Sequence, residues 1–304
     1  MSCFAPLTAY YSAHKNESGK RSLQFRPQGS LSGSRMQLPC GRCMGCRLEH
    51  SRRWAIRMMH EARMHTESCF VTLTYNNQSL PEYGTLVPRD LQLFHKRLNN
   101  RVYERTGHGI RYFGCGEYGD LNKRPHYHSI VFGYDFKDKL LYSRNGRDES
   151  IFSSRELNDV WPMGECKLGA VTFESCAYVA RYVCKKVGGA QREGGHYAVY
   201  DSDGVVFERT PEFANMSRRP GIGLRYFEKY GGEIALHDSV IMDCKEVPST
   251  RYYDNQIERL DPDRMVVLKV LRRRKAVWKE RQVDRRRVKE RLLIARSKQK
   301  ERKL

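Results

Sequence analysis

Two tyrosines, Tyr178 and Tyr182, lie four residues apart in a segment that is expected to be helical. A helix advances about 1.5 Å and 100° per residue, so side chains four positions apart lie about 6 Å apart on nearly the same face. Both phenols can therefore face one phosphate. Attack on a phosphodiester needs help, because a phenol titrates near pH 10. Lys185 is a candidate for lowering the phenol's pKa or contacting the phosphate.

A pair of histidines, His126 and His128, supplies side chains that bind metals. Residues two apart in a strand share a face, so both imidazoles point the same way and Tyr127 points into the core. If the preceding turn is symmetric, Glu117 lies directly across from His126 and adds a carboxylate. This set suits a divalent ion such as Mg²⁺ or Mn²⁺ with positions open for substrate, and such an ion polarises a scissile phosphate.

Each pattern taken alone has a simpler explanation. A His-x-His pair also occurs on surfaces and in cores, and two tyrosines at helical spacing also pack as an aromatic helix face. Lys185 is equally explained as one more basic surface residue. The combination of the two pairs in a single basic chain is what favours an enzyme that cuts DNA.

Three cysteines follow a C-x2-C-x2-C spacing that is one ligand short of a tetrahedral structural zinc site. They are Cys40, Cys43 and Cys46. Cys3 is the preferred fourth ligand, because a zinc ion would then tie the N-terminal segment to the helix that follows; Cys69 and Cys115 are alternatives. An iron–sulfur cluster and free buried thiols also remain open.

The charge of the chain favours a polyanionic partner. Its 304 residues carry 55 Lys and Arg against 35 Asp and Glu, a formal net charge of +20. Nucleic acid is the leading partner for such a chain. No apolar run is long enough to cross a bilayer, so no membrane partner is expected. The first ten residues lack the pattern of a secretory signal, which predicts an intracellular protein with reduced cysteines.

Much of this charge lies near the C-terminus. The segment 263–304 holds 18 Lys and Arg against 5 Asp and Glu, among good helix formers. We expect a long basic helix there that binds phosphates without sequence preference, unless it is merely a solvated helix. Its densest cluster is Arg272, Arg273, Arg274 and Lys275.

Hydrophobic periodicity and capping residues predict the elements around these groups. The predicted helices are 47–65, a second from Pro88 to before Gly107, a short one capped by Ser154, the tyrosine helix capped by Ser175, and 224–230. The predicted strands are 69–75, 110–118, 126–133 and 170–173, with 110–118 and 126–133 forming a hairpin. Arg218 and Arg219 precede the helix at 224, where a phosphate can dock, although loop structure alone explains that stretch equally well.

Three segments, 70–75, 124–128 and 178–186, resemble in order and spacing the three motifs of HUH-type rolling-circle replication initiators with two tyrosines. The likeness is closest to the initiators of small single-stranded DNA phages. Within those, segments 40–47 and 217–223 are similar to the gokushovirus type of the Microviridae. The resemblance spans roughly residues 1–230.

This resemblance implies an α+β protein with the HUH endonuclease fold, a central antiparallel sheet flanked by helices, and a basic helical C-terminal extension. We divide the chain into a Cys-cluster segment and helix at 1–66, an endonuclease core at 67–235 and the extension at 236–304. By position, His126 and His128 match the family's metal ligands, and Tyr178 and Tyr182 match its nucleophiles. Glu117 matches the third ligand less closely, because relatives vary there.

The implied activity is nicking of a replication origin by a tyrosine, which leaves a 5′-phosphotyrosine link and a 3′-hydroxyl that primes synthesis; later rejoining releases circular DNA. The expected partners are single-stranded and supercoiled origin DNA with a host DNA polymerase, in the host bacterial cytoplasm. A host helicase is expected too, because no GxxxxGKS or GxxxxGKT motif occurs. Two alternatives remain: a plasmid relaxase or transposase of the same superfamily, and a non-enzymatic DNA-binding or packaging protein.

Overall fold

The computed structural model of the chain describes residues 3–17, 19, 21–119, 122–185, 195–200, 203–275 and 283–301, without the side chains of 182–185, 283 and 297–301. The chain divides into two compact units, residues 51–271 and residues 1–50 with 272–304. The three-part division drawn from the sequence stays a prediction. None of the helices in the described ranges has the length and apolar character needed to span a membrane.

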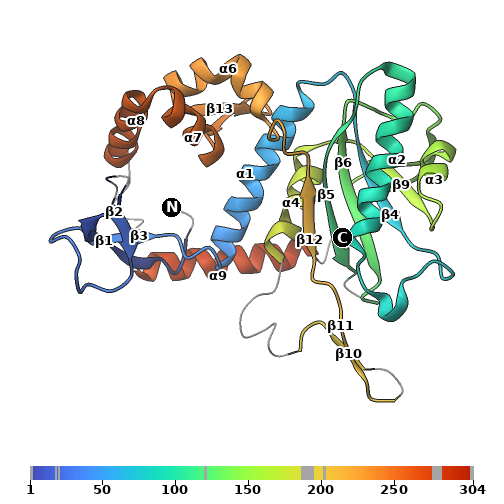
Figure 1. Cartoon of the computed structure of the whole chain (residues 1–304), viewed down its shortest axis with the longest axis horizontal. Coiled ribbons are helices and arrows are strands. Elements are labelled where there is room, and N and C mark those ends of the chain that lie inside the picture. Colours follow the sequence, from blue (N-terminus) through green and yellow to red (C-terminus); the bar gives the residue numbers. More distant parts are fainter. Residues whose placement is uncertain are drawn as a thin grey trace. The chain divides into compact units, whose positions relative to one another are not determined.

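A seven-stranded antiparallel sheet forms the centre of unit 51–271 (Figure 1). Its strand order is β12-β5-β6-β4-β9-β8-β7, so the predicted hairpin strands β5 and β6 lie inside the sheet. The strands are β4 (Ser68–Thr74), β5 (Arg111–Tyr118), β6 (Pro125–Phe132), β7 (Leu140–Arg144), β8 (Ser150–Ser153), β9 (Cys166–Gly169) and β12 (Phe213–Met216). With helices against the sheet, the predicted α+β class is confirmed.

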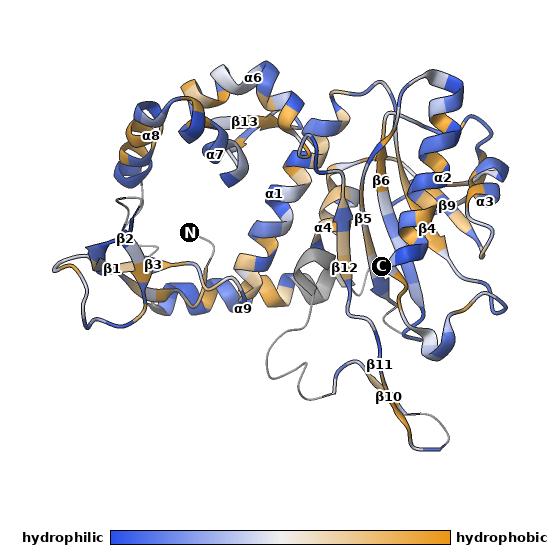
Figure 2. Cartoon of the chain, viewed as in Figure 1, coloured by the Kyte–Doolittle hydropathy of each residue, from blue (hydrophilic) through white to orange (hydrophobic). Residues whose placement is uncertain are grey.

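Helices cover both faces of this sheet. On one face, α2 (Pro88–Thr106) and α3 (Arg155–Val160) enclose a core that includes Tyr127. On the other face, α4 (Phe173–Lys185) and the part of α1 (Met44–Ala62) from Ser51 onward enclose a second core that includes Ile130. Figure 2 shows hydrophobic and hydrophilic residues mixed around α2, as expected for a helix with one buried face. Alternate residues of β6 therefore enter different cores.

Most predicted elements are confirmed within one or two residues. The amphipathic segment 47–65 forms α1, the segment 69–75 forms β4, and α2 starts at Pro88 and ends where Gly107 adopts a left-handed φ of 71°. Ser154 caps α3 as predicted. The helix expected at 224–230 is α6 (Leu224–His237).

Two predictions near the tyrosine helix are wrong. The strand expected at 170–173 is β9, which ends at Gly169, and α4 already starts at Phe173. The cap is Thr172 rather than Ser175: Ser175 N donates to Thr172 Oγ1 at 3.1 Å, and Thr172 N donates to Ser175 Oγ at 2.8 Å. The two hydroxyls satisfy each other's backbone amide, so the pair acts as a capping box with Ser in the third position.

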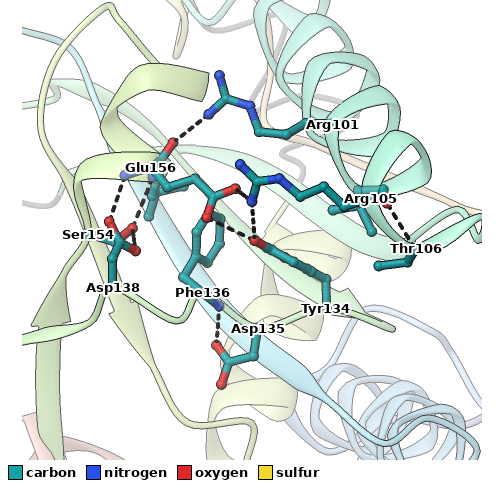
Figure 3. A network of polar contacts seen from close by, with 11 residues as sticks. Arg101, Arg105, Thr106, Tyr134, Asp135, Phe136, Asp138, Ser154 and Glu156 are labelled. Atoms are coloured by element: carbon teal, nitrogen blue, oxygen red, sulfur yellow. Dashed lines mark hydrogen bonds and ion pairs between the residues drawn. The ribbon is translucent and has the colours of Figure 1, made fainter.

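A polar network fixes the start of α3 (Figure 3). The Asp138 carboxylate accepts hydrogen bonds from Ser154 Oγ at 2.6 Å and Glu156 N at 2.8 Å, while Ser154 Oγ accepts one from the backbone amide three residues on at 3.0 Å. The Glu156 carboxylate accepts hydrogen bonds from Tyr134 OH at 2.9 Å and from Arg105 of α2 at 2.6 Å. These contacts hold α3 against α2 and close the first core from the side.

A third core lies between α1 and the elements that follow the sheet. It is built from α6, α7 (Arg251–Leu260), α8 (Pro262–Lys275) and the hairpin β13 (Ser239–Met242) and β14 (Lys245–Pro248). Met265 and Leu268 anchor α8 in it. The remaining elements are β10 (Ala198–Tyr200) with β11 (Val206–Glu208), the 3-10 turn Glu82–Gly84, and, in the other unit, β1 (Leu7–Lys15), β2 (Arg21–Gln24), β3 (Met36–Leu38) and α9 (Val283–Glu301).

The predicted basic helix is represented by α8 and α9, and the residues 276–282 between them lie outside the described ranges. Arg273, Arg274 and Lys275 at the end of α8 are exposed. Their side chains are therefore placed as a phosphate-binding segment requires, although exposure alone does not distinguish that role from a solvated helix.

A buried carboxylate, Glu61 of α1, joins the sheet to the start of α6. It accepts hydrogen bonds from Arg111 Nε at 2.5 Å and from the backbone amide of Gly223 at 2.5 Å. Burial raises the pKa of Glu61, but the bonds from His65, Gly223 and Arg111 outweigh burial and leave the pKa below its ordinary value. The carboxylate is therefore ionised in the folded protein at neutral pH.

We predict that Glu61→Gln lowers the free energy of unfolding by about 3 kcal/mol at pH 7, because Arg111 is left without its buried counter-charge. Since the native pKa lies below that of the unfolded chain, this contribution is present above about pH 4.3 and is lost as the pH falls lower. Urea denaturation of both proteins between pH 7 and pH 4 measures it. An equal loss in the exposed control Glu228→Gln would contradict the prediction.

Candidate active site

The pairing of β5 with β6 brings the predicted metal ligands together. Glu117 is directly opposite His126 in this register, as expected for a symmetric turn. The side chains of Glu117, His126 and His128 offer ligand atoms that all lie within 4.8 Å of one another. Tyr127, between the histidines, is fully buried in the opposite core. The period-two alternation predicted from the sequence is confirmed.

The Glu117 carboxylate is the centre of this cluster. Its Oε1 atom lies 2.6 Å from His126 Nε2 and 2.8 Å from His128 Nε2. Glu117 is 2% exposed, and its Oε2 atom is buried with no hydrogen-bond partner in the described part of the chain. A buried carboxylate oxygen with no donor is costly unless a cation or a proton satisfies it.

The far ring nitrogens show how the imidazoles are held. His126 Nδ1 lies 3.1 Å from the carbonyl oxygen of Arg124, and because a carbonyl only accepts, this nitrogen carries the hydrogen. A neutral ring then presents a lone pair at Nε2, toward Glu117. His128 Nδ1 lies 3.0 Å from Thr72 Oγ1, which supports the same arrangement. Second partners of this kind orient histidines that bind metals through their other nitrogen.

Burial and charge set the ionisation of the cluster. Burial alone raises the pKa of the Glu117 carboxyl, but the contacts with His126 and His128 outweigh it and bring the pKa to about 2. Burial lowers the pKa of His128 more than the neighbouring carboxylate raises it. At neutral pH the cluster therefore contains an anionic carboxylate beside a neutral imidazole. These are the ionisation states in which both residues bind metals, so the donor set fits a divalent cation.

The first tyrosine lies against this cluster. Tyr178, on α4, donates a hydrogen bond from its phenol to Glu117 Oε1 at 2.9 Å, and its ring meets that of His128 edge-on with centroids 5.0 Å apart. The helix is held in place by Val179 and Ala180, which are buried in the second core, and by Ser51 Oγ, which donates to the carbonyl of Ala177. The phenol oxygen is thus within contact distance of a candidate metal ligand.

The second tyrosine and the lysine are placed only by their backbone. Helix α4 continues through Tyr182 to Lys185, and these side chains lie outside the described ones. A position four residues after Tyr178 in an unbroken helix is one turn further along nearly the same face. That both phenols face one phosphate stays a prediction, as does the role of Lys185.

A family model for the replication-associated protein ORF2 matches residues 68–187, a range that contains every candidate active-site residue. Replication-associated protein VP4 of Bdellovibrio phage phiMH2K is 30% identical over 232 residues, 74% of this chain and 69% of that protein. Replication-associated protein ORF2 of Spiroplasma virus 4 is 33% identical over 235 residues, 73% of this chain and 68% of that protein. The chain belongs to this family of phage replication-associated proteins.

A further family member, replication-associated protein ORF4 of Chlamydia phage 1, is 30% identical over 228 residues, which cover 73% of this chain and 54% of that protein. No solved structure gives a significant match. The relationship to replication initiators of Microviridae-like phages, predicted from the sequence, is confirmed at the level of the family.

The two arginines predicted to bind DNA precede α6. Arg218 and Arg219 are exposed, as that role requires. The helix start itself is less suited to phosphate than expected, because the Gly223 amide donates to Glu61 and the Leu224 amide donates to the carbonyl of Gly221. A phosphate near this loop would therefore be bound by the arginine side chains rather than by these two amides.

The predicted cysteine cluster forms with the preferred fourth member. The four thiols of Cys3, Cys40, Cys43 and Cys46 lie within 4.8 Å of one another. The alternatives, Cys69 and Cys115, are buried in β4 and β5 among apolar side chains of the sheet cores. The choice of Cys3 over Cys69 and Cys115 agrees with this geometry.

Sequence analysis missed the roles of Thr72 and Phe70 on β4. Thr72 pairs with His128 across the strands and contacts its Nδ1, while the Phe70 ring stacks on His128 with centroids 5.5 Å apart. Both residues belong to an alternating apolar strand, and the one available signal was that Phe70, Thr72 and Thr74 share a face. Locating that face against the histidines requires the strand order.

We predict that Thr72→Val weakens Mn²⁺ binding about 10-fold, because it removes the hydroxyl that orients His128 while keeping the strand's β-branched shape. Titration calorimetry of the purified protein with Mn²⁺ measures the effect. Thr74→Val is the matched control, since the Thr74 hydroxyl bonds the carbonyl of Glu165 instead. Equal affinities in wild type and both variants would refute a role for Thr72.

Proposed function

We propose that this protein initiates rolling-circle replication by nicking single-stranded origin DNA through a tyrosine. The observation that carries the proposal is the Tyr178 phenol, 2.9 Å from a carboxylate that also contacts two imidazoles. Membership in a family of phage replication-associated proteins supports a replication role. The nucleophile and a candidate metal site are neighbours, as phosphodiester transesterification requires.

Glu117, His126 and His128 would hold the divalent ion, Mg²⁺ or Mn²⁺. When bound, that ion supplies positive charge to the non-bridging oxygens of the scissile phosphate. The chain's own residues do the rest. Glu117 orients the Tyr178 phenol through its hydrogen bond, and the backbone carbonyl of Arg124 and the hydroxyl of Thr72 keep the histidine lone pairs turned inward.

The reaction exchanges one phosphodiester for another. The tyrosine oxygen forms a bond to phosphorus, the bond from phosphorus to the 3′ oxygen breaks, the phenol loses its proton, and the departing oxygen takes up a proton as a 3′-hydroxyl. The energy of the broken bond is retained in the 5′-phosphotyrosine link, so cleavage needs no ATP. Tyr182, one helical turn from Tyr178, would cut the regenerated origin after a round of synthesis, and the released 3′-hydroxyl would then attack the first link and close a circle.

The partners follow from this chemistry. The target strand must be unpaired to reach a half-buried phenol, so single-stranded or supercoiled origin DNA is the substrate. Strand separation and synthesis would come from a host helicase and a host DNA polymerase in the bacterial cytoplasm. No membrane takes part in the reaction.

The direct test uses single-stranded oligonucleotides tiled across the phage genome that encodes this chain, incubated with protein and Mn²⁺ and run on denaturing SDS gels. We expect a covalent protein–DNA band with wild type and with each single variant, Tyr178→Phe or Tyr182→Phe. In the double variant it should fall by more than about 10³-fold, because no nucleophile remains. ATP should have no effect.

Tyr103→Phe is the matched control, because Tyr103 is 59% exposed on α2, a helix on the other face of the sheet. A double variant that retains the band would refute the assignment of the nucleophiles. DNA binding with no covalent band for any oligonucleotide would favour the packaging alternative. Transfer of the linked strand to a second DNA molecule, with no closed circles, would favour a relaxase or transposase.

A second prediction concerns the basic segment at the end of α8. Replacing its four cations by Ala should weaken binding to any single strand, and the slope of log affinity against log salt should shrink by about 0.7 for each phosphate that the variant no longer binds. Fluorescence anisotropy from low to moderate salt measures the slope. An unchanged slope would mean that the segment is only solvated. The four residues are Arg272, Arg273, Arg274 and Lys275.

A further inference from the structure

The unit formed by residues 1–50 and 272–304 differs from the rest of the protein in how it is stabilised. The three apolar cores of the described structure consist of residues from the other unit. Among the described residues of this smaller unit, Cys3 and Ala9 are the buried hydrophobic ones. A three-stranded sheet and a helix with so little buried apolar surface are marginally stable, and small units of this kind commonly depend on disulfides or metals.

The four clustered thiols lie where such a unit needs a cross-link. Cys3 precedes β1, Cys40 follows β3, and Leu7 of β1 pairs with Leu38 of β3, so two thiols lie beyond the same end of the sheet. Cys46 is the third residue of α1. The described cysteines are free thiols, and the Cys3 and Cys43 sulfurs are 4.0 Å apart, about twice the length of a disulfide. We propose that these four thiols bind a single structural zinc ion.

The spacing of the sulfurs favours one ion over a cluster. A zinc ion 2.3 Å from each of four tetrahedral thiolates places the sulfurs about 3.8 Å apart. The observed thiols all lie within 4.8 Å of one another, so a small inward movement gives this geometry. A four-iron cluster interposes several iron and sulfide atoms and holds its cysteines much further apart. The structure therefore narrows the choice that the sequence left open.

Backbone amides already point at the sulfurs. Cys40 N donates to Cys3 Sγ at 3.2 Å, Cys43 N donates to Cys40 Sγ at 3.3 Å, and Phe4 N donates to Cys43 Sγ at 3.4 Å. Such bonds disperse the negative charge of metal-bound thiolates. Gly41 adopts a φ of +74° between Cys40 and Cys43, a left-handed conformation that lets the chain turn back so tightly.

Binding exchanges up to four thiol protons for one Zn²⁺ without redox change, so no other reactant is required. The result would be a closed site with no position for substrate. Its role would be to hold the ends of β1 and β3 and the start of α1 together, independently of the nicking chemistry. Loss of the ion would unfold the sheet of this unit while leaving the His and Glu cluster intact.

The test is elemental analysis of the full-length protein purified from zinc-containing medium, with its metal-free form reloaded with Co²⁺. We expect about one zinc per chain in wild type, and in the cobalt form a thiolate charge-transfer band with strong tetrahedral d–d bands. Cys3→Ser and Cys43→Ser should lose the ion. Cys244→Ser, which removes an exposed thiol, should keep it, and so should the double variant of Tyr178 and Tyr182.

A measurement on wild type alone covers the case in which the cysteine variants fail to fold. Alkylation followed by peptide mapping should show the four clustered thiols protected until a strong chelator is added, while Cys244 reacts throughout. Zinc at background level with the four thiols reactive, iron with sulfide instead of zinc, or full zinc retention by both cysteine variants would each overturn the proposal. Because metal content is read without DNA, a failed nicking assay would not affect it.

Discussion

The register between β5 and β6 is the constraint on which the candidate active site depends. A slip of one residue would move His126 and His128 into the core that holds Tyr127 and would place Tyr127 beside Glu117. The two faces prevent this, because Tyr127 is fully buried and its hydroxyl contacts that of Tyr75 at 2.7 Å. Packing on the far face thus fixes the polar side chains on the near face. The site is precise because the opposite core is dense.

The same arrangement explains why the near face is unfavourable without a cation. The sheet, α1 and α4 exclude water from Glu117, so its charge has lost most of its hydration. The imidazoles that contact it are oriented by Thr72 and by the Arg124 carbonyl, which use the ring nitrogens that face away from Glu117. A site optimised for stability alone would pair this carboxylate with an arginine, as Glu61 is paired with Arg111. The difference between the two buried glutamates reflects function at one and structure at the other.

The sequence predicted those parts of the fold and site that depend on local periodicity. Alternation on β6, the hairpin with Glu117 opposite His126, and the start of α2 at Pro88 all follow from residues that are close in the chain. Contacts between distant segments were not predictable. Thr72 meets His128 because β4 lies beside β6, and Glu61 occupies the Gly223 amide although 162 positions separate the two residues. The start of α4 was misplaced because Thr172 and Ser175 are both good capping residues, and only their mutual hydrogen bonds decide between them.

The two candidate metal sites differ in ligand chemistry, and that difference separates their roles. Imidazole and carboxylate donors on one side of an ion leave positions open, which suits an ion such as Mg²⁺ or Mn²⁺ that must also bind a phosphate and release it. Four thiolates surround their ion, favour soft metals and exchange slowly. The catalytic cluster is built on strands within a dense core, whereas the cysteines lie in a unit that has almost no core. Packing therefore positions the proposed catalytic ion, whereas at the cysteine cluster the proposed ion would position the chain.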